Sequence, residues 1–247
     1  MAIITGAGRG LGKAFAARFA QEGAKLLLPD INLERAEATA GEIRANGGAA
    51  LAIETDISNE QATRKMAEIA IEQYGKVDIL LNNAAIIYGI LPEPWDSWTV
   101  EQWNNIFAVN VIGTWLCCKA IAQFMVKQLK GKIINIASDV PKLPPSQLVL
   151  PYAVSKAAVW TLTQSLARAL GPSNINVNAI APGRTATESS LLGDDSDNAF
   201  EETIAIQALK RREEPVDLVG AAVFLASKDS DFITGQVIIV DGGAVML

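Results

Sequence analysis

Tyr152 and Lys156 are four residues apart in a stretch that predicts a helix, residues 152–170. Residues at positions i and i+4 lie on one helix face, so both side chains can reach one cleft. The pKa of a free tyrosine is about 10, too high for an efficient general base at neutral pH, but a nearby ammonium favours the phenolate. Since the chain has no histidine, this pair predicts proton transfer by a tyrosine. Ser138 follows an apolar strand-like run and offers a further hydroxyl.

A second cluster of chemistry lies near the N-terminus, where a glycine-rich run opens a predicted helix: Thr5-Gly6-Ala7-Gly8-Arg9-Gly10-Leu11-Gly12. Glycines let the backbone approach a pyrophosphate, and a helix N-terminus supplies free N–H groups. Asp30 ends the next strand-like segment, 24 residues after Gly6, close to the ~20 expected for an acid on an adenosine ribose. A carboxylate there repels a 2′-phosphate and favours NAD over NADP. Arg9 argues the other way, because an arginine in this loop could reach that phosphate.

Strand-like and helix-like segments alternate along the chain and must position these residues. The expected strands are 2–4, 25–28, 50–54, 77–81, 132–136, 176–180 and 237–240. The expected helices are 13–21, 33–45, 60–74, 100–130 with breaks, and 152–170. Such alternation predicts an α/β fold: a Rossmann-type doubly wound parallel sheet of about seven strands, with helices on both faces, in a single domain, 1–247. A polar, acidic, irregular stretch at about 187–212 is typical of a substrate lid.

Composition excludes several other classes of function. The net charge is −6 and the basic residues are scattered, which argues against nucleic acid as a partner. The two cysteines, Cys117 and Cys118, are adjacent, so neither a disulfide nor a metal site is expected. No run of about 18 uncharged apolar residues predicts a membrane span, and the first residues do not resemble a signal peptide. We therefore expect a cytoplasmic protein without a membrane partner.

Further motifs follow in order along the chain. They are Asp56-Ile57, Asn82-Asn83-Ala84-Ala85, Asn110, Ile136-Ala137-Ser138, Tyr152-x-x-x-Lys156, Pro182-Gly183 with Thr185 and Thr187, and Val240-Asp241-Gly242-Gly243. With Thr5-Gly6-x-x-x-Gly10-x-Gly12, this set resembles the short-chain dehydrogenase/reductase family over essentially the whole chain. That resemblance implies a nicotinamide cofactor, a small-molecule substrate and a homotetramer (or homodimer) that pairs helices 100–130 and 152–170.

The resemblance also implies roles for individual residues. The catalytic residues would be Asn110, Ser138, Tyr152 and Lys156. Tyr152 would exchange the proton of an alcohol or ketone, Lys156 would favour its phenolate, and Asn110 would support a water chain to Lys156. The cofactor would contact a longer set: Gly6, Arg9, Gly10, Leu11, Gly12, Asp30, Asp56, Ile57, Asn83, Ala84, Ala85, Tyr152, Lys156, Pro182, Gly183, Thr185 and Thr187.

Two positions depart from the family pattern. Ala85 replaces the last glycine of its motif, which is tolerable if φ is negative there. Ser138 precedes Tyr152 by 14 residues, one more than the common spacing, and the extra residue falls in 139–151.

The expected substrate is a small secondary alcohol or ketone, apolar or aromatic, in the manner of bacterial NAD-dependent secondary-alcohol dehydrogenases. Its pocket would be lined by apolar side chains and Tyr88: Ile87, Tyr88, Leu143, Leu148, Val149, Leu150, Leu191 and Leu192. Three alternatives are a 3-oxoacyl-(acyl-carrier-protein) reductase using NADPH, a sugar or polyol dehydrogenase, and a non-catalytic nucleotide-sensing protein on the same fold.

Overall fold

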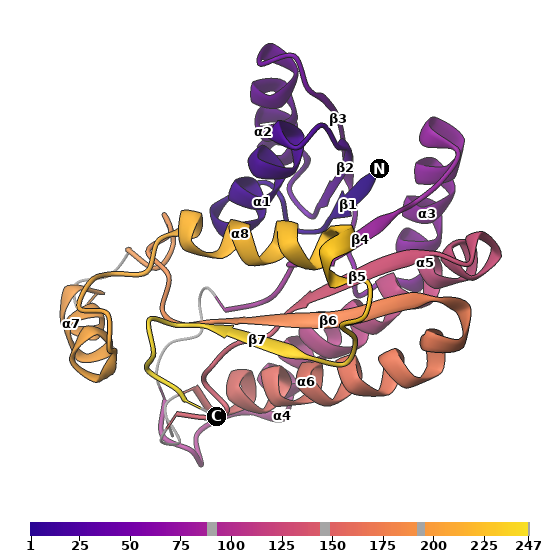
Figure 1. The fold of residues 1–247 in the computed structure, drawn as a ribbon. Coiled ribbons are helices and arrows are strands. Elements are labelled where there is room, and N and C mark those ends of the chain that lie inside the picture. Colours follow the sequence, from indigo (N-terminus) through magenta and orange to yellow (C-terminus); the bar gives the residue numbers. More distant parts are fainter. Residues whose placement is uncertain (88–92, 144–148, 192–195, 247) are drawn as a thin grey trace.

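A computed structural model describes residues 1–87, 93–143, 149–191 and 196–246. All of its named strands form one seven-stranded parallel sheet in the order β3-β2-β1-β4-β5-β6-β7 (Figure 1). The strands are β1 (Ala2–Ile4), β2 (Lys25–Asp30), β3 (Ala49–Glu54), β4 (Ile79–Asn82), β5 (Gly131–Ile136), β6 (Ile175–Pro182) and β7 (Val237–Val240). From β1, strands β2 and β3 are added toward one edge of the sheet, and strands β4 to β7 are added toward the other edge. This confirms the predicted doubly wound sheet.

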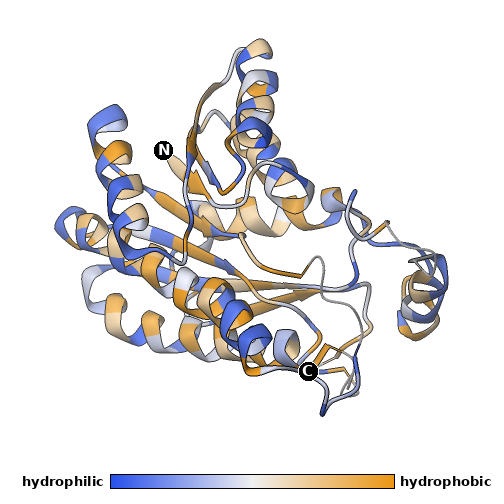
Figure 2. Cartoon of the chain, turned by 180° about the vertical axis from the view of Figure 1, so that it is seen from behind, coloured by the Kyte–Doolittle hydropathy of each residue, from blue (hydrophilic) through white to orange (hydrophobic). Residues whose placement is uncertain are grey.

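Alternate residues of each strand feed two separate apolar cores. Leu26 and Leu28 pack into the core on one face of the sheet, whereas Leu27 packs into the core on the other. Successive side chains of a strand point to opposite faces, so a continuous apolar run suits a sheet that is covered on both sides. Figure 2 shows the helices apolar toward the sheet and hydrophilic on much of their outer surface.

Helices cover both faces of the sheet. The first core packs against α1 (Gly10–Gln21), α2 (Leu33–Ala45) and α8 (Pro215–Ala226). The second core packs against α3 (Glu60–Tyr74), α5 (Thr114–Gln128) and α6 (Leu150–Leu170), and α4 (Val100–Phe107) lies against α6 (Figure 1). The bounds predicted for α2 and α3 are those observed. The Asn59 side chain caps α3 at its start, and Gly75, with a φ of 74°, ends it.

The broken helix expected over 100–130 contains a π-helical turn, Ala108–Gly113, between α4 and α5. The hydroxyl of Thr114 donates to the carbonyl of Asn110 at 2.8 Å, one turn back. Such turns bring one extra residue into a helix and frequently mark functional sites. Here the turn contains Asn110, one of the predicted catalytic residues.

Two helices were not predicted. The stretch expected to be irregular contains α7 (Ser196–Ile206). Its Phe200 ring is contacted by Arg184 and Arg212, whose guanidinium carbons lie 4.9 Å and 4.8 Å from the ring centroid. Helix α8 follows, with Pro215 in its first turn and a reciprocal cap between Glu214 and Asp217. Its near-uniform apolar composition hides the helical period, so the residue pattern did not indicate a helix there.

One continuous helical stretch, Val100–Gln128, is long and apolar enough to cross a membrane by length and composition. A continuous helix of this length and apolar composition was not expected from the sequence. Half of its most apolar window is buried inside the protein, as in the core helix of a folded domain. Its inward side chains, including Cys117, Ile121 and Met125, belong to the core between α3, α5 and the sheet.

Candidate active site

The predicted site residues gather along one edge of the sheet. The strands are parallel, so their carboxyl ends meet at the same edge, and each motif follows such an end. The glycine run follows β1, Asp30 ends β2, Asn83 follows β4 and Ser138 follows β5. This arrangement brings together residues that are more than 100 positions apart in the sequence.

The glycine run packs tightly on the segment after β4. Gly6 has a φ of 65°, and a Cβ on Gly12 would lie 2.0 Å from the carbonyl oxygen of Gly6. The side-chain amide of Asn83 donates to the carbonyls of Thr5 and Gly6, both at 3.0 Å. A Cβ on Gly6 would lie 2.8 Å from the Cα of Ala84. The glycines are therefore needed for close packing of the loop as well as for its turn.

Asp30 faces the same glycine loop. One carboxylate oxygen accepts from the N–H of Gly8 at 2.9 Å, and the other accepts from the N–H of Asn32 at 2.9 Å. Each oxygen retains capacity for a further hydrogen bond, such as one from a hydroxyl group. The backbone therefore orients the carboxylate at the position that the sequence predicted for a ribose contact.

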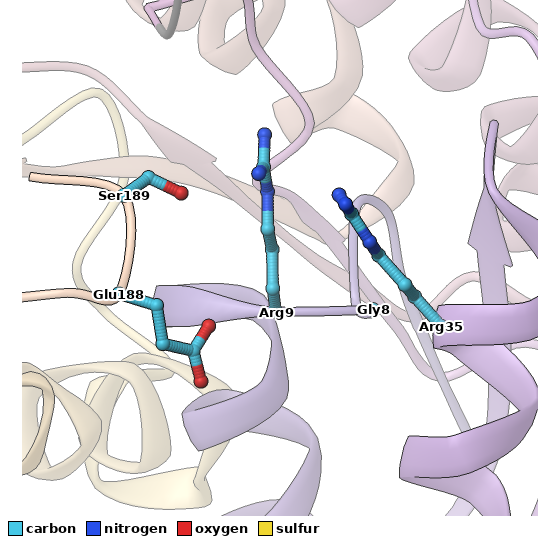
Figure 3. A pocket seen from close by; sticks show the side chains of 5 residues that line it. All are labelled: Gly8, Arg9, Arg35, Glu188 and Ser189. Atoms are coloured by element: carbon cyan, nitrogen blue, oxygen red, sulfur yellow. The ribbon is translucent and has the colours of Figure 1, made fainter. Parts of the chain in front are cut away.

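A hollow of about 400 Å³ lies in front of this loop, lined by Gly8, Arg9, Arg35, Glu188 and Ser189 (Figure 3). Arg9 and Arg35 extend in the same direction, and the carboxylate of Glu188 lies on the other side of the Arg9 backbone. Glu188 accepts from the N–H of Gly10 at 3.4 Å. Arg35 and Glu188 were not predicted site residues, because neither lies in a recognisable motif.

These groups fit a dinucleotide. Arg9 is the N-cap residue of α1 and its own side chain does not cap the helix. In the first turn, the N–H of Gly10 makes one long bond, of 3.4 Å, to the carboxylate of Glu188. A helix N-terminus of this kind, beside two guanidinium groups, suits a pyrophosphate. The carboxylate of Asp30 supplies the acceptor that a ribose hydroxyl requires.

The other predicted cofactor contacts lie around this edge in different settings. Asp56 is exposed and accepts from the hydroxyl of Ser58, whereas Ile57 is buried. Leu11 and Ala85 are half-buried. Ala85 is not among the non-glycine residues with positive φ in the described chain, which are Leu129 and Asn174, so its methyl group causes no left-handed strain.

Tyr152, Lys156 and Ser138 lie where α6 meets the end of β5. The Lys156 ammonium donates to the carbonyl of Ile136 at 2.8 Å, and one helical turn later the indole of Trp160 donates to the carbonyl of Ser138 at 3.1 Å. These two bonds fix the helix on the strand end. Lys156 Nζ is 5.7 Å from the ring centroid of Tyr152, and the exposed fractions of Tyr152, Lys156 and Ser138 are 9%, 4% and 8%.

Asn110 joins this group from the π-helical turn. Its amide oxygen accepts from the N–H of Ile86 at 2.7 Å, and its amide nitrogen donates to the carbonyl of Ile86 at 3.1 Å. The same nitrogen donates to Ser155 Oγ at 3.0 Å. The side chain therefore ties the segment after β4 to the second turn of α6.

Burial changes the ionisation of three groups near this site. It lowers the pKa of Lys156 to about 8. Burial, assisted by the charge of Asp241, raises the pKa of Asp139 to about 7. Burial also raises the pKa of Glu213 to about 7, with a further contribution from the charge of Asp139. Perturbed groups of this kind cluster at functional sites, and only Lys156 was a predicted one.

The predicted substrate wall lies only partly in the described chain. Leu143, Val149 and Leu150 are half-buried, and Ile87 and Leu191 are exposed. Tyr88, Leu148 and Leu192 lie outside the described residues. Among the described residues, no group of three or more cysteine, aspartate or glutamate side chains is placed to hold a metal ion.

Comparison with known proteins gives a consistent set of relatives. Residues 6–245 match a family model described as enoyl-(acyl carrier protein) reductase. A short-chain reductase of Streptomyces niveus is 35% identical over 98% of this chain and 93% of its own, and a sorbitol dehydrogenase of Cereibacter sphaeroides is 38% identical over 98% and 96%. A crystal structure of a short-chain type dehydrogenase/reductase from Mycobacterium marinum superposes with a TM-score of 0.92 at 32% identity, covering 100% of this chain and 95% of the other.

Proposed function

The chain belongs to the short-chain dehydrogenase/reductase family, and we propose that it transfers a hydride between NAD(H) and a small secondary alcohol or ketone. The observation that carries this proposal is the placement of a buried lysine beside a tyrosine at the strand end that bears Ser138. The bound nicotinamide would supply the hydride chemistry, and the residues of this chain would handle the proton.

We assign the proton-transfer roles that the family resemblance implies to the residues at the meeting point of α6 and β5. Tyr152 Oη accepts the hydroxyl proton during oxidation and returns it during reduction. The ammonium of Lys156 stabilises the phenolate form of Tyr152 electrostatically. Ser138 Oγ donates to the substrate oxygen and holds it near Tyr152. Asn110 supports the start of α6 and, as proposed from the family, a water chain to Lys156.

The cofactor would be held by the glycine loop and the strand ends beside it. The N–H groups at the start of α1 bind the pyrophosphate, and Asp30 accepts from the adenosine ribose. A carboxylate oriented by two backbone N–H groups favours NAD. NADP stays an alternative because Arg9 and Arg35 line the adjoining hollow. Paired fluorescence titrations of NADH and NADPH, with wild type and Asp30→Ser, test this choice. We expect wild type to prefer NADH and the variant to gain affinity for NADPH.

For the substrate we propose a small apolar or aromatic secondary alcohol, bound against the half-buried Leu143, Val149 and Leu150. A polyol is the second candidate, favoured by the similarity to a sorbitol dehydrogenase. A panel of aryl alcohols, alkyl alcohols, hexitols and acyl thioesters separates these candidates from the acyl reductase. Turnover of hexitols alone would overturn the apolar proposal.

Replacement of Tyr152 by phenylalanine tests the mechanism. Tyr152→Phe removes only the hydroxyl, so NADH binding should stay near the wild-type value while turnover falls below about 1% of wild type. Tyr74→Phe is the matched control. The Tyr74 hydroxyl donates to the carbonyl of Leu26 near the amino end of β2, whereas Ser138 follows the carboxyl end of β5 at the opposite edge of the sheet. Retained turnover in Tyr152→Phe would contradict the mechanism. Retained NADH binding without any turnover in wild type would favour the nucleotide-sensing alternative.

We further propose a cytoplasmic homotetramer. Exposed apolar side chains lie along the two helical stretches that would pair, with Ile112, Trp115 and Val126 on the first and Val154 on the second. These exposed apolar side chains would be buried if the two stretches paired with another chain. Light scattering coupled to size exclusion measures the state directly, and a monomer at micromolar concentration would contradict the proposal.

A further inference from the structure

Three carboxyl groups are buried together beyond the ends of β5, β6 and β7. Asp139, Glu213 and Asp241 are 4%, 5% and 3% exposed. Glu213 approaches from the segment before α8, which pairs with Thr185 through an isolated parallel bridge. Buried carboxylates are costly unless they are neutralised or well hydrogen-bonded, so their presence here calls for a physical role.

Glu213 holds the segment that the proposed function assigns to the nicotinamide. Its carboxyl accepts from the hydroxyl of Thr185 at 2.5 Å and from the N–H of Gly183 at 3.3 Å. Its backbone carbonyl accepts from the N–H of Ala186 at 2.7 Å. Glu213 therefore fixes the position of residues 183–186 through three hydrogen bonds.

Asp139 contacts the proposed catalytic serine and reaches the same segment. Its carboxylate accepts from the hydroxyl of Ser138 at 3.3 Å, and its N–H donates to the carbonyl of Pro182 at 3.0 Å. A change in the charge of Asp139 thus acts on the hydroxyl that would bind the substrate oxygen.

The two acids interact electrostatically, and negative groups surround them. The Asp139 charge disfavours ionisation of Glu213, and the Asp241 charge disfavours ionisation of Asp139. Asp241 is engaged by the N–H groups of Gly243 and Val245. From α8, Asp217 adds a negative charge toward Glu213, while the nearby exposed Arg211 is paired with Asp217. Two ionised carboxylates would therefore repel one another without a buried cation in the described part of this cluster.

We propose that the buried carboxyls of Asp139 and Glu213 act as positioning residues that together keep Ser138 and residues 183–186 in place. Ionisation of both carboxyls would make them repel one another and loosen the nicotinamide segment. The inference rests on the proposed function of Ser138 and of this segment. It predicts cofactor binding that weakens as pH rises through neutrality, independently of the ionisation of Tyr152.

NADH fluorescence titrations between pH 6 and pH 8.5 test the pair without any substrate. In wild type the NADH Kd should rise about tenfold over this range. Glu213→Gln keeps the shape and hydrogen-bonding groups but cannot ionise, so its Kd should change little apart from the contribution of Lys156, which wild type shares. Glu214→Gln, an equal charge change on the exposed neighbour, should follow wild type.

Asp139→Asn provides a second variant if Glu213→Gln folds poorly, and it should flatten the profile in the same way. A wild-type pH dependence that persists unchanged in both variants would overturn the pair. Failure of wild type to bind NADH at every pH would instead overturn the proposed function, and this inference with it.

Discussion

The side-chain amide of Asn110 donates to the hydroxyl of Ser155 at 3.0 Å, and that hydroxyl donates to the carbonyl of Tyr152 at 2.7 Å. The chain of bonds begins in a π-helical turn and ends on the residue proposed to move the proton. Since Asn110 also pairs with both backbone groups of Ile86, one side chain fixes two segments of the site.

Asn110→Ala should reduce stability and slow turnover together. It leaves several buried or partly buried polar groups without their partner, at a cost of about 2 kcal/mol in the free energy of unfolding. We expect kcat to fall more than the NADH affinity, because the start of α6 shifts. Urea unfolding and steady-state kinetics measure the two effects. Asn104→Ala, on the exposed face of α4, is the control, and equal behaviour of both variants would contradict the assignment.

Lys156→Met should increase stability while it lowers activity. The pKa of Lys156 is depressed by burial to about 8, so below that pH the buried ammonium disfavours the folded state, and this penalty disappears as pH rises toward 10.5. Allowing for the lost hydrogen bond to Ile136, we expect a gain of about 2 kcal/mol at pH 7 and a smaller gain at pH 10. Turnover should fall at least about 100-fold.

A second buried lysine supplies the comparison for that variant. Lys132 is paired with Asp231 at 2.7 Å and hydrogen-bonds Ser230, so Lys132→Met should destabilise the protein. Stabilisation by both variants would show that the ion pair of Lys132 does not offset the burial of its ammonium. Destabilisation by both would contradict the prediction for Lys156.

Gly12→Ala should abolish NADH binding. The added Cβ would lie 2.0 Å from the carbonyl oxygen of Gly6, so the glycine loop must move away from α1. We expect a loss of more than about 2 kcal/mol in the free energy of unfolding. Gly171→Ala is the matched control, because a Cβ there meets no atom within 4 Å and its φ is −54°. Calorimetric titration with NADH that gives similar affinity for both variants would contradict this reading of the loop.

The stability of wild type should fall as pH rises from about 4.5 to about 7. The pKa of Glu213 is raised from 4.5 to about 7 in the folded state, so the folded chain binds more protons than the unfolded chain in this window. The stabilisation is fully present below pH 4.5 and is lost as pH rises through 7, by on the order of 2 kcal/mol. Glu213→Gln should lack this component, and thermal unfolding at several pH values measures it. An identical pH slope in the variant would remove Glu213 as its source.

The sequence predicted the sheet because its strands are short apolar runs separated by helical patterns, as at Leu26–Leu28 and its following helix α2. The spacing of Tyr152 and Lys156 predicted that both would reach one cleft, and the family resemblance predicted that Ser138 would join them. Helix α7 was missed because its polar composition resembles a loop, and its packing depends on Arg184 and Arg212, which lie outside it. Asp139 and Glu213 are 74 positions apart and leave no local pattern in the sequence, since they bond the same segment, residues 182–183, only once β5 and β6 lie side by side.

Burial of Asp139, Glu213 and Lys156 gives this histidine-free chain an unusual titration behaviour near neutral pH. In an ordinary protein, imidazole groups titrate between pH 5 and 8 whether or not the chain is folded, and they obscure other protonation events. Here the side chains that ionise near neutrality do so because the fold has desolvated them. Proton uptake or release near pH 7 can be followed with an indicator dye during refolding. It would report the burial of these three side chains with little contribution from other side chains.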